Sequence, residues 1–220
     1  MASNFQDDDR EDAMRSLFNL HKDENEGRSG VDAFLDVNDQ RIHFELKTTS
    51  NGSVTTVRDF GPDHIKKWKN KHWLIGFFIN DREYYKYGSP AMMEEWIKGK
   101  EKYISPDFKL SSLVYEKLDI DDVHQILEPK GKYSLQDAKS IHKKQYKKEE
   151  YLALQDVQSG YSPERMLEIV KDRAKYLMER GSTLNNPHIP PSYFKGWEEI
   201  ESNHADRLLC MVKKSLEEKS

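Results

Sequence analysis

The sequence predicts an α/β protein: a mixed central sheet that contains an antiparallel hairpin, helices that flank it, and a mostly helical C-terminal half. Three observations favour this class. Apolar residues alternate in short runs between residues 31 and 87, Asn-Asp pairs separate neighbouring runs, and apolar residues recur at helical spacing from about residue 104. The 220 residues suit a single domain, 1–220, with a core at 1–103 and a mostly helical part at 104–220.

The first half should contain most of the strands. Pro62 and Pro90 suit the first turn of a helix, and the lysines at 66, 67, 69 and 71 should largely face outward from the helix that contains them. The expected elements are a helix at 8–21, a loop at 23–30, strands at 31–37, 40–48 and 54–58, a helix at 62–71, strands at 73–79 and 83–87, and a helix at 91–102.

The second half should be helical. Helices are expected at 119–128, 134–157, 163–180 and 193–218, with a proline-bearing loop at 182–192. Ser134 and Ser162 are predicted N-caps, because a serine hydroxyl can accept a hydrogen bond from the first turn. Gly181 stands where a helix C-terminus favours glycine.

Charge is segregated along the chain, although the formal total is only −4. Residues 1–29 hold four basic and eight acidic side chains, whereas residues 130–148 hold seven lysines and one aspartate. Such a basic stretch suits a polyanionic partner and equally suits a solvated helix face. Total charge therefore does not exclude a nucleic-acid partner.

The sequence indicates an intracellular, cytoplasmic setting. The N-terminus is acidic and lacks the features of a secretory signal, and no apolar run is long enough to cross a membrane. Cys210 has no second cysteine to pair with, which favours a reducing compartment. Its apolar neighbours predict that Cys210 is buried and inert.

The segment 30–49 is the most informative for function. When a hairpin closes on Asn38-Asp39, Ala33 faces Phe44 and a continuous apolar face results. The same register places Asp32 directly opposite Glu45.

Two opposed carboxylates suit a divalent cation. Without one, the pair should cost about 0.2–1 kcal/mol. Mg²⁺ reverses the sign, since it prefers one or two carboxylates with water and phosphate oxygens. Lys47 shares the face of Glu45, so the three side chains could hydrolyse a phosphodiester. A solvent-exposed charged sheet face is the alternative.

These residues resemble the signature of the PD-(D/E)XK nuclease superfamily. Asp32 is followed, after twelve residues, by Glu45-Leu46-Lys47, and Val31 replaces the usual proline. The resemblance covers about residues 8–87. It implies a restriction-endonuclease-like fold and a Mg²⁺-dependent nuclease that leaves 5′-phosphates. Asp32, Glu45 and the Leu46 carbonyl would hold the metal, Lys47 would lie beside the attacking water, and Glu11 is a possible accessory acid.

Within this superfamily, the chain most resembles a type II restriction endonuclease, a prokaryotic-type enzyme. The resemblance implies a homodimer that cuts double-stranded DNA at specific sequences, since a two-fold axis presents one site to each strand. Two alternatives remain open. One is a structure-specific nuclease, such as a Holliday junction resolvase or a repair nuclease. The other is a non-catalytic DNA-binding protein in which the acidic pair is structural.

Two loops and one lysine-rich stretch could contact DNA. Side chains that can read base edges occur in the segments 48–59 and 182–192. The stretch 130–148 would contact phosphates, which position a protein without specifying sequence. Plain connecting loops and a solvated face are the alternatives. The candidate residues are Asn51, Arg58, Lys143, Lys144, Asn185, Asn186 and His188.

Overall fold

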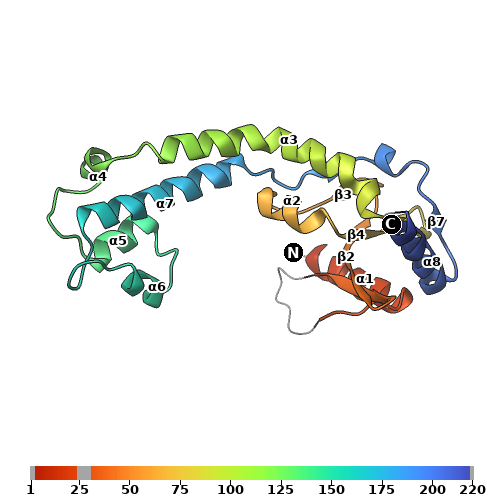
Figure 1. Ribbon diagram of the computed structural model, residues 1–220. Coiled ribbons are helices and arrows are strands. Elements are labelled where there is room, and N and C mark those ends of the chain that lie inside the picture. Colours follow the sequence, from red (N-terminus) through yellow and green to blue (C-terminus); the bar gives the residue numbers. More distant parts are fainter. Residues whose placement is uncertain (1–2, 24–30, 219–220) are drawn as a thin grey trace. The chain divides into compact units, whose positions relative to one another are not determined.

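The structure of the protein is a computed structural model that describes residues 3–23 and 31–218 (Figure 1). The chain forms two compact units: unit 1 contains the residues up to 102 together with those from 184 onward, and unit 2 contains residues 103–183. The sequence analysis placed 104–220 together, whereas the segment from 184 belongs to unit 1. All but the first residue of the expected loop at 23–30 lie outside the described residues.

Unit 1 is built on a mixed five-stranded sheet, which confirms the α/β class. The strand order is β1-β2-β4-β5-β7; β2 and β4 are parallel, and the other neighbours are antiparallel. A separate two-stranded sheet pairs β3 with β6. The strands are β1 (Ala33–Val37), β2 (Gln40–Thr49), β3 (Val54–Thr55), β4 (His72–Ile79), β5 (Arg82–Gly88), β6 (His188–Ile189) and β7 (Glu199–Ile200).

The hairpin register predicted from the sequence is confirmed. Ala33 pairs with Phe44 and the two strands run antiparallel. Asn38 and Asp39 both adopt left-handed backbone angles, with φ of 50° and 62°, as a two-residue turn of this kind requires. The Asn80-Asp81 turn between β4 and β5 has the same conformation.

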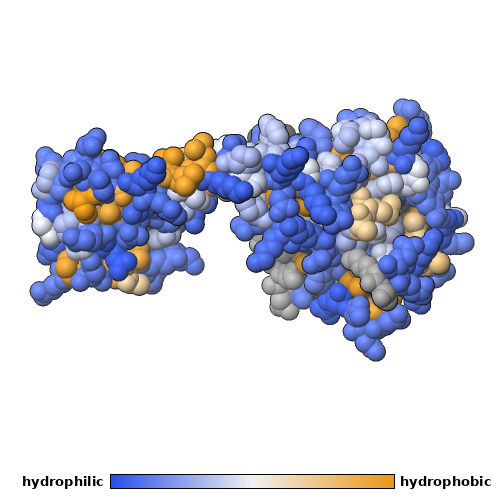
Figure 2. All heavy atoms as spheres, turned by 45° about the horizontal axis from the view of Figure 1, so that its top comes forward, coloured by the Kyte–Doolittle hydropathy of each residue, from blue (hydrophilic) through white to orange (hydrophobic). Residues whose placement is uncertain are grey.

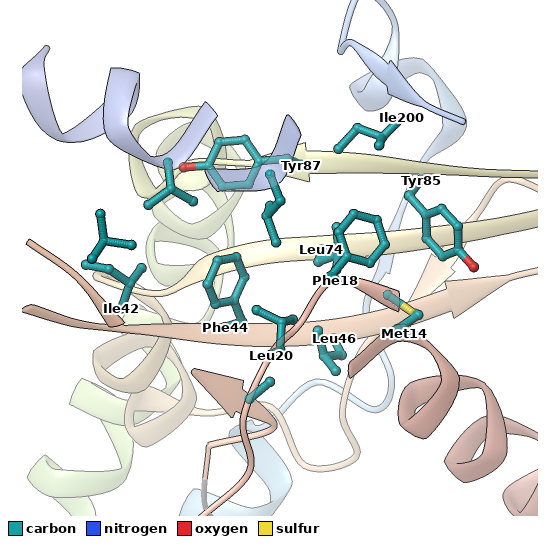
Figure 3. Close-up of a cluster of buried hydrophobic side chains, with 14 residues drawn as sticks. Met14, Phe18, Leu20, Ile42, Phe44, Leu46, Leu74, Tyr85, Tyr87 and Ile200 are labelled. Carbon is teal, nitrogen blue, oxygen red and sulfur yellow. The ribbon is translucent and has the colours of Figure 1, made fainter. Parts of the chain in front are cut away.

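The helices of unit 1 cover both faces of the sheet. Met14 of α1 and Phe18, just after that helix, join one buried cluster with Leu208 and Val212 of α8 and the apolar side chains of β2 and β4 (Figure 3). On the other face, the Trp68 ring of α2 meets the Trp73 ring of β4 at 5.0 Å between centroids. The helices are α1 (Ser3–Leu17), α2 (Pro62–Trp68), α3 (Pro90–Tyr115), the 3₁₀ turn η1 (Pro191–Phe194) and α8 (His204–Glu217).

Several helix boundaries differ from the expected ones. The first helix ends at Leu17, because Asn19 adopts a left-handed conformation and His21 pairs with Phe34 across a β-bridge. The helix expected at 193–218 begins only at His204, since the preceding segment adds β7 to the sheet. Helix α3 continues past residue 102, through Pro106, which lacks the N–H that would bond the carbonyl of Lys102.

Unit 2 is helical. Its core contains Val123, Tyr133, Tyr151 and Tyr161 among other apolar residues. Ser134 and Ser162 accept hydrogen bonds from Asp137 N–H and Arg165 N–H, so both predicted N-caps are confirmed. The helices wholly within this unit are α4 (Ile120–Ile126), α5 (Leu135–His142), α6 (Lys148–Ala153) and α7 (Pro163–Ser182).

Two predictions about unit 2 and one about unit 1 are wrong. The helix expected at 134–157 is two helices, because Lys143 and Lys144 both adopt left-handed angles. Gly181 lies inside α7, whose C-cap is Thr183. Cys210 is exposed on α8, on the side of the helix away from Leu208 and Val212.

The surface in Figure 2 is mostly hydrophilic and is interrupted by separate hydrophobic patches. Among the described residues, no helix is both long enough and apolar enough to cross a membrane.

Gly76 should be essential to the packing of α1 on the sheet. A Cβ at Gly76 would lie 2.9 Å from the Phe78 ring and 3.2 Å from both Met14 Sδ and the Tyr85 ring. We therefore expect Gly76→Ala to lower the free energy of unfolding by about 1–3 kcal/mol through overpacking. Tryptophan fluorescence during urea unfolding reports on unit 1 alone, because all four tryptophans lie there.

Gly99→Ala in α3 is the matched control. No atom lies within 4 Å of a Cβ at that position, so alanine should stabilise the helix by about 0.5–1 kcal/mol. A Gly76→Ala protein as stable as Gly99→Ala would contradict the packing described for α1.

Candidate active site

The candidate site lies where the β1–β2 ladder starts. The ladder begins with Ala33 opposite Phe44, whereas β2 continues alongside β4 to Thr49. The Asp32 side chain reaches the next part of β2, where its Oδ2 accepts a 3.0 Å hydrogen bond from the Leu46 N–H. The hairpin therefore holds the Asp32 carboxylate beside Glu45-Leu46-Lys47.

Three oxygens surround the ammonium of Lys47. Lys47 Nζ donates to the Leu46 carbonyl at 2.7 Å, and it lies 3.1 Å from Glu45 Oε1 and 3.7 Å from Asp32 Oδ2. Burial alone would lower the pKa of Lys47, but the carboxylates of Glu45, Asp32 and Glu11 raise that pKa above its ordinary value. Lys47 is therefore a full cation at neutral pH.

Glu45 is held between two lysines. Its side chain is only 4% exposed; Oε1 faces Lys47, and Oε2 accepts a 2.9 Å hydrogen bond from Lys71 Nζ. Burial would raise the pKa of Glu45, but the two ammonium groups lower it to about 2. Glu45 is thus an ionised, fully paired carboxylate within the protein.

Lys71 is a site residue that the sequence analysis missed, since it was expected to face outward. Only 4% of Lys71 is exposed. The parallel pairing of Glu45 with Trp73 brings the start of β4 alongside Glu45, and Lys71 lies two residues before Trp73, on the same side. The one local signal was its position next to a fully apolar strand. Burial and the Lys71 ammonium lower the pKa of Lys67, so a cationic cluster borders Glu45.

Helix α1 brings Glu11 to the same site. Arg15 of α1 donates from Nη1 to the Asp32 backbone carbonyl at 3.2 Å and so ties the helix to the start of β1. Burial raises the pKa of Glu11 to about 7; Lys47 opposes that rise and Asp32 adds to it. The accessory acid predicted from the sequence therefore lies among the other predicted site residues.

A cleft of about 350 Å³ opens next to Glu11 and Lys47. The turn after β2 forms its wall, where Asn51 Oδ1 accepts a 3.0 Å hydrogen bond from Ser53 N–H and so fixes the turn. The cleft gives a polar substrate a path to Lys47. Its other lining residues are Arg10, Thr48, Thr49, Ser50, Thr55 and Thr56.

The two loops proposed to read bases lie side by side in unit 1. Thr55 Oγ1 lies 3.2 Å from His188 Nδ1, and Asn186 N–H donates to the Val57 carbonyl at 3.1 Å. Arg58, Asn185 and His188 are exposed, whereas Asn186 adopts a left-handed angle in a turn. Lys143 and Lys144 belong to unit 2.

The oxygens around Lys47 fit a hard divalent cation. They comprise two carboxylates and one carbonyl, which matches the preference of Mg²⁺ for one or two carboxylates completed by water or phosphate. They already surround one cation, the Lys47 ammonium. In residues 3–23 and 31–218, no three His, Cys, Asp or Glu side chains form a group that could hold a metal. Any metal held here would therefore need the backbone carbonyl of Leu46 as well as the two carboxylates.

A comparison with models of known protein families finds no match, and a search of curated proteins finds no similar sequence. The function must therefore be argued from the geometry of the site.

The Glu45–Lys71 pair should be strongly coupled. Lys71→Met leaves Glu45 Oε2 buried without its partner, which should cost about 3 kcal/mol of unfolding free energy. In a double-mutant cycle with Glu45→Gln, we expect a coupling energy of about 1–3 kcal/mol, measured by tryptophan fluorescence in urea. The cycle of Lys69→Met with Glu101→Gln, an exposed pair at 3.1 Å, is the control and should give less than about 1 kcal/mol. Additive effects at Glu45 and Lys71 would contradict the geometry.

The same carboxylate should make stability depend on pH. The pKa of Glu45 is about 2 in the folded protein and about 4.5 ordinarily. Its charge therefore stabilises the fold above pH 4.5, by about 3 kcal/mol, and this contribution is lost as the pH falls toward 2. The difference in unfolding free energy between wild type and Glu45→Gln should shrink over that range. A constant difference would refute the assignment.

Proposed function

We propose that this protein is a Mg²⁺-dependent DNA endonuclease of the type II restriction class, which hydrolyses phosphodiester bonds and leaves 5′-phosphates. One observation carries the proposal: Asp32, Glu45 and the Leu46 carbonyl surround the ammonium group of Lys47 at the start of the hairpin ladder. The mixed sheet supports it, because an antiparallel hairpin followed by a parallel strand suits a restriction-endonuclease-like core.

Asp32, Glu45 and the Leu46 carbonyl are the residues that would hold Mg²⁺. When bound, the ion would polarise the phosphate and lower the pKa of a coordinated water. For these oxygens to hold the ion, the Lys47 ammonium would have to move away from them, and the adjoining cleft offers it space.

Each side chain of the site has a separate role in this proposal. The Leu46 N–H fixes the orientation of Asp32. Lys71 holds Oε2 of Glu45, so that Oε1, which now faces Lys47, could face the ion instead. Lys47 would lie beside the attacking water, where its ammonium would orient the water and stabilise negative charge on the phosphate. Arg15 holds α1, and with it Glu11, against this arrangement.

Sequence-specific cleavage also requires base reading and two active sites. Asn51, Arg58, Asn185 and His188 are exposed on the paired loops of unit 1, and they are the candidates for contacts with base edges. A homodimer would present one site to each strand of double-stranded DNA. The lone cysteine favours a reducing, intracellular setting for such an enzyme.

A plasmid digest with Mg²⁺, followed by mapping of the ends, tests this proposal. Discrete fragments with common end sequences support the restriction class. Cleavage confined to four-way junctions or flaps would instead assign a structure-specific nuclease to the same site.

Substitutions in the site should separate catalysis from binding. Asp32→Ala, Glu45→Gln and Lys47→Ala should each reduce Mg²⁺-dependent cleavage by about 10²–10³-fold or more, because Asp32 and Glu45 would hold the ion and Lys47 would stabilise charge at the phosphate. DNA binding in Ca²⁺ should persist, as measured by fluorescence anisotropy. Asp36→Ala and Lys69→Ala are the matched controls; both side chains are at least half exposed, and neither should change the rate. Cleavage that survives the site substitutions would leave the acidic pair a structural role only.

A further inference from the structure

Helices α5 and α6 of unit 2 follow one another as in a helix-turn-helix. Only three residues separate the C-cap Lys143 from the N-cap Lys147. Helix α5 packs against α7 (Figure 1), and an isolated antiparallel β-bridge, Tyr133–Tyr161, joins the segment before α5 to the segment before α7. The turn between α5 and α6 is thus supported on more than one side.

Side chains of the turn fasten it to α7. Tyr146 OH donates to Asp172 Oδ2 at 2.5 Å, and His142 Nε2 lies 2.9 Å from the same oxygen. Gln145 Oε1 accepts from Arg173 Nη1 at 2.7 Å. His142 is 2% exposed, so this anchor reaches the core of the unit. The turn therefore holds one conformation.

Four lysines of this fastened turn face solvent: Lys143, Lys144, Lys147 and Lys148. Within the described part of the chain, no carboxylate lies within ion-pair distance of these four ammonium groups, whereas nearby Lys130 pairs with Asp137 at 3.2 Å. Glu150 is engaged as a cap, because its carboxylate accepts the Lys147 N–H at 2.6 Å. The result is a cluster of four exposed lysines on a fastened turn, none of them in an ion pair within the described residues.

Two lysines of the turn adopt a backbone conformation that lysine does not favour. Lys143 and Lys144 adopt φ of 53° and 58°, a left-handed conformation that costs non-glycine residues about 1 kcal/mol or more each. Glycine or asparagine would fit there with less strain. Lysine at both positions adds positive charge to the turn, whereas glycine or asparagine would make the turn more stable.

We propose that the lysine turn, residues 143–148, is a docking surface for the sugar-phosphate backbone of duplex DNA that works without metal and lies outside the candidate active site. The inference rests on the proposed function only because that function identifies DNA as the polyanion. Lysine contacts to phosphate position a protein without reading sequence. Glu149 and Glu150 open α6, so the turn, and not the start of α6, is the surface that suits phosphates.

Salt-dependent DNA binding by the full chain tests the proposal. Binding to a labelled DNA duplex is measured in EDTA, so that no cleavage occurs, over a range of KCl concentrations. For Lys143→Ala/Lys144→Ala, the slope of log K against log salt should become shallower by about two units, since each lost contact removes about 0.9. Lys109→Ala/Lys117→Ala is the control: it removes two exposed lysines from the same unit and should leave the slope unchanged.

The outcomes separate this proposal from the nuclease. Equal slopes for the two double variants would overturn the docking surface even if cleavage is found. If the wild type cuts no DNA but Lys143→Ala/Lys144→Ala makes the slope of log K against log salt shallower, the docking surface stands and the nuclease proposal is overturned. Equal affinity and slope for an RNA duplex of the same length would overturn DNA as the partner.

Discussion

The burial of the Glu45 carboxylate constrains much of unit 1. Removal of a carboxylate from water costs several kcal/mol unless its oxygens find cations and hydrogen bonds in return. Here each oxygen has one lysine: Lys47 comes from the same strand, and Lys71 is the residue just before the neighbouring parallel strand β4. The pairing of β2 with β4 therefore brings Lys71 to the buried Glu45 carboxylate as well as packing the apolar side chains of the two strands. The start of β1 is tied to the same cluster, because Asp32 shares the Lys47 ammonium.

This arrangement lets the site fold before any metal arrives. Oxygens gathered for a divalent cation repel one another, and some metal sites remain unfolded until the ion binds. In this protein, the ammonium of Lys47 supplies the positive charge, so two carboxylates and two lysines already balance. Under the proposed function, a Mg²⁺ ion would therefore have to displace a lysine that is tightly held.

The sequence predicts the hairpin well because its determinants are local. Alternation fixes the apolar face, Asn38-Asp39 fixes the turn, and the register that brings Asp32 toward Glu45 follows from both. Lys71 could not be predicted, since its burial depends on a parallel pairing across the 26 residues that separate it from Glu45. The break at Lys143 was missed for another reason: lysine carries no signal for a left-handed conformation, and the contacts that hold the turn come from α7. In both cases the deciding interaction is distant in sequence.

The last helix has a consequence for synthesis on the ribosome. Unit 2 is inserted in the chain of unit 1, between residues 102 and 184, and α8 contributes Leu208 and Val212 to the cluster that covers one face of the main sheet. While the chain emerges, unit 2 can complete its own core first, whereas the sheet with the candidate site still exposes an apolar face. Unit 1 would therefore remain incomplete until residues 204–217 have emerged, and a chain truncated before them would lack the helix that covers this face of the sheet.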